Sequence, residues 1–199
     1  MRFIAFLLVA LAFSGPAVAQ AWKDYTSSDY GFTVSFPIDP EITNSTFQAV
    51  EGRTVPARVW TVTRNKNIFK VTVADLANTG LQESAVIDHA IRALSQGGEV
   101  KVNFPHRIYQ VYGRQISIVG QDGSRETAAV FDYNGRLYQI EAKMLPGGDD
   151  TDVIRFQQSL IFTDRGSNRP QDTIQAIRQA CRGVVNNPAG IDDPRCQKR

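Results

Sequence analysis

Residues 125–144 read RETAAVFDYNGRLYQIEAKM, and this stretch decides the fold. Apolar and polar residues alternate on both sides of the central Asn134-Gly135 pair. Asn-Gly takes the positive φ angles of a two-residue hairpin turn, and strict alternation is typical of strands with one buried face. The sequence therefore predicts adjacent antiparallel strands at 125–133 and 136–144.

The second of these strands has two clearly different faces. One face carries Tyr138, Ile140, Ala142 and Met144, and we expect it to be buried. The other face carries Gln139, Glu141 and Lys143. A slip of one residue would exchange the two faces, so this pattern sets the register of the strand.

Further strands are expected on both sides of this hairpin. Alternation or β-branched runs bounded by Pro, Gly, Asn and Asp indicate each of them. They lie at 32–36 (ended by Pro37), at 61–73 (a hairpin around Asn65-Lys66-Asn67), at 100–104 (stopped by Pro105) and at 115–119 (followed by Asp122-Gly123).

Two amphipathic helices are predicted between the strands. Residues 82–96 place Ile87, Ala90, Ile91 and Leu94 on one stripe, and Gly97-Gly98 ends the helix. Residues 150–160 place Val153, Phe156 and Leu160 on another stripe. Helices between antiparallel strands predict a layered α+β domain over 20–163.

The first twenty residues, MRFIAFLLVALAFSGPAVAQ, have the three regions of a secretory signal peptide. Arg2 precedes an apolar run over 3–13, a break follows, and Ala17-Val18-Ala19 forms a small-residue cleavage site. The run is shorter than the roughly 20 residues that a membrane span needs. We therefore expect a signal peptide at 1–19 and an exported chain without a membrane span, in the periplasm or, alternatively, outside the cell.

The C-terminal region differs in composition from the body. Residues 164–170 are expected to form a linker, and residues 171–199 a basic, helical extension with a helix over 171–182. Cys181 and Cys196 are the only cysteines of the chain. Export to an oxidising compartment favours a disulfide between them, and two independent thiols are the alternative.

Two segments resemble a known family. Residues 28–37, SDYGFTVSFP, are similar to the first strand of PsbP-like and DcrB-like domains, and residues 135–162 resemble their closing strand and last helix. The resemblance covers about residues 25–163 and implies a PsbP-like α/β/α domain, in which an antiparallel β-sheet is sandwiched between helices. Relatives include a photosystem subunit, a Ran-binding protein and bacterial envelope proteins, so the resemblance implies an interaction role and no shared chemistry.

No catalytic, cofactor or metal motif stands out. The chain has two histidines, and His89 is expected to face solvent on its helix, whereas His106 follows Phe104-Pro105 at a position that suits a cleft. The acidic segment 147–152 could bind calcium through oxygen ligands, but capping of the following helix by Asp149 or Asp150 explains it better. We expect a non-enzyme without a cofactor.

One short segment is both basic and aromatic. It is also the best candidate for an interaction patch, since Tyr and Arg are enriched at interface hot spots. A solvated strand face is the alternative interpretation. The patch residues are His106, Arg107, Tyr109, Tyr112 and Arg114.

Three functions fit these observations. The first is a non-catalytic interaction or accessory module of the bacterial envelope that binds an envelope protein. The second is a small-ligand binder that uses a pocket between sheet and helix, lined by Trp22, Trp60 and tyrosines. The third is an unrecognised hydrolase or metalloenzyme at His106. Nucleic acid is not an expected partner, because the body over 20–165 carries 15 Lys and Arg against 17 Asp and Glu.

Overall fold

The computed structural model describes residues 22–77 and 79–163, and within them the chain forms ten strands and two α-helices. The strands are β1 (Lys23–Ser27), β2 (Phe32–Phe36), β3 (Glu41–Gln48), β4 (Thr54–Arg64), β5 (Asn67–Asp75), β6 (Glu99–Ile108), β7 (Val111–Val119), β8 (Arg125–Tyr133), β9 (Arg136–Met144) and β10 (Ile161–Phe162). The helices are α1 (Glu83–Ser95) and α2 (Asp150–Gln157), with a 3-10 turn, η1 (Val50–Gly52), before β4.

Several predictions fall outside the described residues. They are the signal peptide at 1–19, the linker at 164–170, the helical extension at 171–199 and the bond between Cys181 and Cys196. No helix among the residues that the structure describes is long and apolar enough to cross a membrane.

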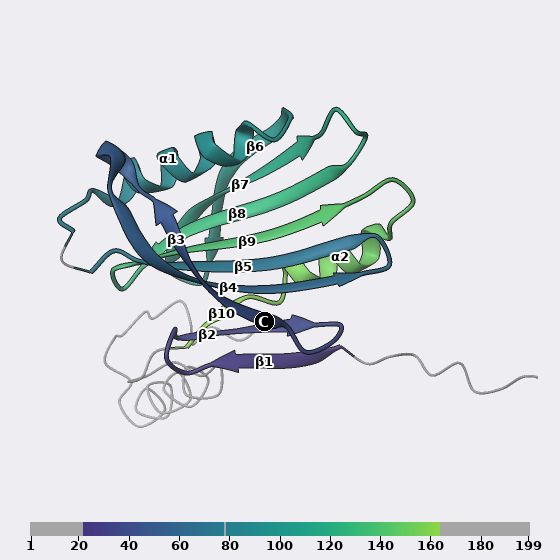
Figure 1. Cartoon of the computed structure of the whole chain (residues 1–199), viewed down its shortest axis with the longest axis horizontal. Helices are drawn as coiled ribbons and strands as arrows, with labels where there is room; N and C mark the ends of the chain where they lie inside the picture. The colour runs from purple at the N-terminus through teal and green to yellow at the C-terminus, as the bar shows by residue number, and fades with distance from the viewer. Residues whose placement is uncertain (1–21, 78, 164–199) are drawn as a thin grey trace, which may run out of the picture.

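The strands form two antiparallel sheets (Figure 1). The large sheet has seven strands in the order β3-β4-β5-β9-β8-β7-β6, and the small sheet has three in the order β1-β2-β10. The predicted α+β class is therefore confirmed.

Both predicted hairpins turn through two residues with positive φ angles. Asn134 and Gly135 have φ angles of 52° and 70°, and Asn65 and Lys66 have 48° and 63°. Positive φ at both central positions matches the right-handed twist of the strands that flank a two-residue turn. β8 and β9 consequently start and end at the predicted residues.

One face of the large sheet packs against α2 and the small sheet. Phe32 of β2 and Trp60 of β4 meet edge to face, with ring centroids 4.8 Å apart, and Trp60 is 1% exposed. Phe156 of α2 packs on Phe69 of β5 and on Phe36 of β2. These aromatic side chains join the two sheets and α2 in one core.

The opposite face of the large sheet is covered by α1, which contacts β7 and β8. Val86, Ile87, Ala90 and Ile91 are buried there, so the predicted apolar stripe is confirmed except for the half-buried Leu94. The expectation of helices on both faces is met only in part. The other face is covered by α2 together with the small sheet, and the sequence did not predict that β2 belongs to a separate sheet (Figure 1).

β6 differs from its prediction because it continues through Pro105 to Ile108. β6 is the edge strand of the large sheet, where the missing N–H of a proline interrupts no ladder with an outer neighbour. Pro105 pairs with Arg114, and β7 starts at Val111, four residues before the predicted start. The basic and aromatic segment therefore forms the end of a long hairpin.

On β9, Gln139 and Glu141 point away from the aromatic core as predicted, yet both are buried. The Glu141 carboxylate accepts a hydrogen bond from Lys70 Nζ at 2.7 Å and forms an ion pair with it. Burial raises the pKa of Glu141, and the Lys70 charge opposes this shift. Alternation alone assigns such residues to a separate face without showing what covers that face.

Candidate functional site

The β6–β7 hairpin separates from the rest of the large sheet at its tip. Pairing between β6 and β7 extends to Ile108 and Val111, whereas pairing between β7 and β8 ends at Gly113 and Phe131. The tip residues therefore lie beside the end of β8 without bonding to it. Two hollows adjoin the tip, and both are lined in part by Ile108 and Tyr109.

We call the five predicted patch residues the hairpin surface. They are His106, Arg107, Tyr109, Tyr112 and Arg114. The structure places all of them on this hairpin but divides them between two faces, since strand residues alternate. Arg107 pairs with Tyr112 and lies 5.8 Å from the centroid of its ring, while His106 pairs with Gly113 on the other face.

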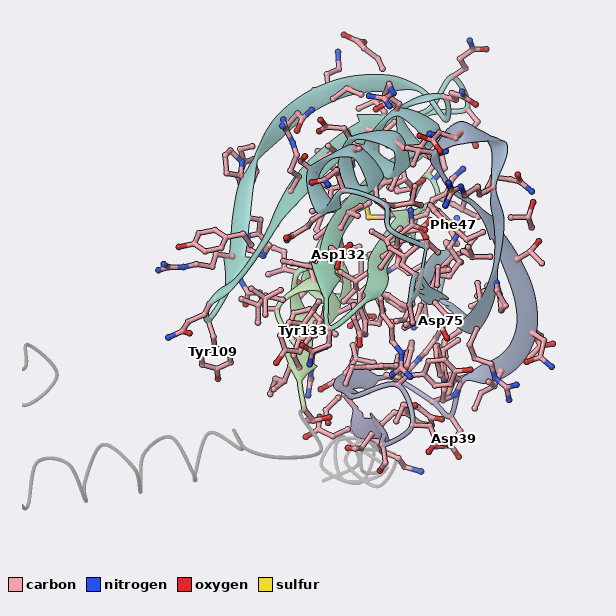
Figure 2. All side chains as sticks on the ribbon, turned by 90° about the vertical axis from the view of Figure 1, so that its left-hand side faces the viewer. Asp39, Phe47, Asp75, Tyr109, Asp132 and Tyr133 are labelled. Atoms are coloured by element: carbon pink, nitrogen blue, oxygen red, sulfur yellow. The ribbon has the colours of Figure 1, made fainter. Side chains whose placement is uncertain are left out.

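Tyr109 and Tyr112 are strongly exposed parts of the hairpin surface, and each is 65% exposed. Tyr109 occupies the turn with a φ angle of 53°, and Figure 2 shows it at the tip of the hairpin. Arg114 is held differently: its guanidinium donates to Asn103 Oδ1 at 2.7 and 3.1 Å and lies 3.9 Å from Asp88 Oδ1. Arg114 is therefore anchored within the protein, whereas the two tyrosines face outward.

His106 packs among aromatic rings. Its ring centroid lies 5.6 Å from that of Phe131 and 6.4 Å from that of Phe104. Gly113, between β6 and β8, makes this possible, because a Cβ there would lie 2.2 Å from the Val130 carbonyl oxygen and 2.4 Å from Phe131 Cδ1. Burial lowers the pKa of His106, so the neutral imidazole is favoured.

His106 also lines the first hollow, which we call the sheet–helix hollow. It has a volume of about 580 Å³ between β6, β7 and β8 on one side and α2 on the other. Gln115, Thr127, Ile154 and Gln157 contribute to its wall. The predicted cleft position of His106 is thus confirmed. The two tryptophans that were expected to line a pocket between sheet and helix do not line this hollow: Trp60 lies in the core, and Trp22 packs against Phe69.

The second hollow, the end cavity, lies between the hairpin tip and the end of β8. Its volume is about 600 Å³, and its wall includes Glu83, Tyr109, Tyr112, Asp132, Tyr133 and Phe162. Asp132 and Tyr133 are labelled close to the hairpin in Figure 2. Tyr133 stacks on Phe162 with a centroid distance of 5.0 Å. The cavity therefore combines aromatic rings with two carboxylates.

Asp132 is the titratable group most affected by this environment. Burial and then the negative charge of Glu83, at the start of α1, raise its pKa to about 6. Sequence reasoning missed Asp132 because a single Asp in an alternating strand gives no signal. Its neighbour Glu83 comes from an element 49 residues earlier.

The remaining candidates have structural roles. Asp149 caps α2, since its carboxylate accepts a hydrogen bond from Thr151 N at 2.8 Å, as predicted. Asp150 forms an ion pair with Arg125 at 2.9 Å. His89 is half-buried and contacts Phe47 edge to face at 6.4 Å, so the expectation that it faces solvent is met only in part. β3 curves toward α1 and brings Phe47 there. No metal-binding cluster occurs among the residues described.

The chain is similar in outline to three solved structures. It is 14% identical to PsbP from the cyanobacterium Synechocystis sp. PCC 6803, with a TM-score of 0.46 over 77% of this chain and 99% of that one. A protein from Bacteroides thetaiotaomicron is 13% identical, with a TM-score of 0.41 over 82% of this chain and 59% of the other. A protein of unknown function from Pseudomonas aeruginosa is 10% identical, with a TM-score of 0.34 over 69% and 89%.

The predicted resemblance to PsbP-like domains is thus confirmed as a weak resemblance of fold. No protein-family model and no curated protein matches the chain.

Proposed function

We propose that the chain is an exported, non-catalytic interaction module of the bacterial cell envelope, located in the periplasm. The signal-peptide pattern of residues 1–19 supports export. The hairpin surface is the part of the described chain that would contact an envelope protein. We propose no cofactor and no nucleic-acid partner.

The exposure of Tyr109 and Tyr112 at the hairpin tip carries this proposal. Each of these tyrosine residues is 65% exposed, and Phe104 on β6 is 40% exposed. Aromatic rings flanked by arginine provide large contact area together with polar groups, which is typical of interface hot spots. Burying these rings against a partner would recover the hydrophobic free energy that their exposure forgoes.

The test is a crosslinked pull-down of the tagged, exported protein from its native host, identified by mass spectrometry. We expect one dominant envelope partner, with at least a tenfold lower yield when Tyr109→Ser and Tyr112→Ser are combined. Ile42→Ser serves as the control, since Ile42 is an exposed apolar residue on β3, the opposite edge strand. Equal yields from the tyrosine variant and the native chain would contradict the proposal.

The alternative is a small-ligand binder that uses the sheet–helix hollow. A volume of about 580 Å³ lies in the range of ligand pockets. Native mass spectrometry of protein purified from the host distinguishes the two functions. A stoichiometric small molecule that is lost from a Gln115→Trp variant, which narrows the hollow, would favour the alternative.

A further inference from the structure

The wall of the end cavity combines aromatic rings with carboxylates. Three tyrosines and Phe162 contribute rings, and Glu83 and Asp132 contribute carboxylates. Among the residues described as lining it, none is Lys, Arg or His. Aromatic faces and carboxylates both attract cations, and neither attracts anions.

The carboxylates of the end cavity lack a compensating charge within the described chain. Burial acts on Asp132, and the one charge that shifts its pKa is the like charge of Glu83. Asp132 is half-buried and Glu83 is exposed, and both line the same cavity. Like charges that face one cavity repel, and an opposite charge between them removes that repulsion. A cation between Asp132 and Glu83 would therefore be attracted by both carboxylates, and a neutral water molecule would not remove their repulsion.

Two of the tyrosines that line the cavity are also accessible to a cation. Tyr112 already has a guanidinium near its ring, that of Arg107 at 5.8 Å. Tyr109 and Tyr112 are mostly exposed, while Tyr133 is half-buried on Phe162. Two of the three tyrosines are thus exposed at the hairpin tip, and the third packs on Phe162 of β10.

We propose that the end cavity binds an organic cation, an alkylammonium or guanidinium group, between the Asp132 and Glu83 carboxylates and the tyrosine rings. The inference builds on the proposed function, because it names the chemistry of the partner group at the hairpin surface. A lysine or arginine side chain of a partner protein and a free amine share this chemistry. The volume of about 600 Å³ accommodates either.

The test measures the binding of small probes to the purified, full exported chain by isothermal titration and by amide chemical shifts. The probes are Nα-acetyl-lysine amide, the free diamine cadaverine and the uncharged Nα-acetyl-norleucine amide. We expect saturable binding of the cationic probes and at least tenfold weaker binding of the norleucine analogue. The lysine amide binding more tightly than cadaverine would indicate a side chain as the source, and the reverse order a free amine.

Three variants check the site. Asp132→Asn and Glu83→Gln should each weaken binding of the cationic probes at least fivefold, and their folding is verified by circular dichroism. Asp39→Asn makes the same change of charge at an exposed carboxylate far from the cavity and should change binding less than twofold. Tyr112→Phe keeps the ring and should bind like the native chain, whereas Tyr112→Leu should not.

Equal binding of the lysine and norleucine amides, or equal weakening by Asp39→Asn and Asp132→Asn, would overturn the inference. The test needs no partner protein. Failure of probe binding with partner capture intact would therefore remove the cation site and leave the interaction module. Loss of partner capture with probe binding intact would remove the interaction module and leave the cation site.

Discussion

Asp132 shows how much one residue depends on its neighbours in space. In the sequence it is one polar residue among alternating apolar ones. In the structure it lies half-buried in a cavity, near the carboxylate of Glu83 on α1 and the phenol of Tyr112 on β7. The guanidinium of Arg107 lies 5.8 Å from the centroid of the Tyr112 ring. The raised pKa of Asp132 means that the folded state holds its proton more tightly than the unfolded state.

Replacing Asp132 by Asn should therefore stabilise the protein at neutral pH and leave it unchanged in acid. As the pH rises from about 4 through about 6, the unfolded state loses this proton first, and the stability of the native chain falls. Because Asp132 is half-exposed, solvent screening limits the gain of Asp132→Asn above pH 6 to about 1 kcal/mol. Urea unfolding of both chains at pH 4, 5, 6 and 7 measures this difference. A gain that is constant across this range would show that titration of Asp132 is not its cause.

At the scale of elements, local signals and the tertiary context act together. The turn at Asn134-Gly135 and the alternation on both sides predict β8 and β9 to the residue. α2 begins where Asp149 was expected to cap it. By contrast, β3 over Glu41–Gln48 is polar and exposed, and its sequence has no alternation by which it could be predicted. β3 exists because β4 offers it a free edge.

Removing the cap of α2 should destabilise the protein to a limited extent. Asp149→Ala leaves the Thr151 N–H without its acceptor, and we expect a loss of about 1 kcal/mol in the free energy of unfolding. Asp149→Asn keeps an oxygen at the cap and should lie close to the native value. Urea unfolding measures both variants. Equal losses in both would indicate that the carboxylate charge, and not the cap, stabilises this helix end.

At the scale of the whole molecule, the two sheets form one folding unit. Phe32 and Phe36 of the small sheet pack on Trp60 of the large sheet and on Phe156 of α2. The shared core predicts one cooperative transition, because the small sheet, α2 and one face of the large sheet bury the same set of side chains.

Phe32→Ala should cost about 3–5 kcal/mol, since it removes a fully buried ring from the contact between the sheets. Urea unfolding followed by tryptophan fluorescence and by far-UV circular dichroism should give coincident transitions for the native chain and the variant. Tyr109→Ala, at the exposed tip, should change stability by less than about 0.5 kcal/mol. A fluorescence transition that precedes the dichroism transition in the native chain would show that the small sheet unfolds alone.

The chain's own pattern determined the α+β class, both helices, the central hairpin and the cap of α2. These features depend on residues close in the sequence, so turn chemistry and periodicity report them directly. Only the tertiary structure decided the division into two sheets, the burial of Glu141, the contact of His89 with Phe47 and the effect of the Glu83 charge on Asp132. Each of these depends on which distant segment covers a face, and no local pattern carries that information. The end cavity exists for the same reason: β7 leaves β8 at Gly113, and the space that opens is filled by neither strand.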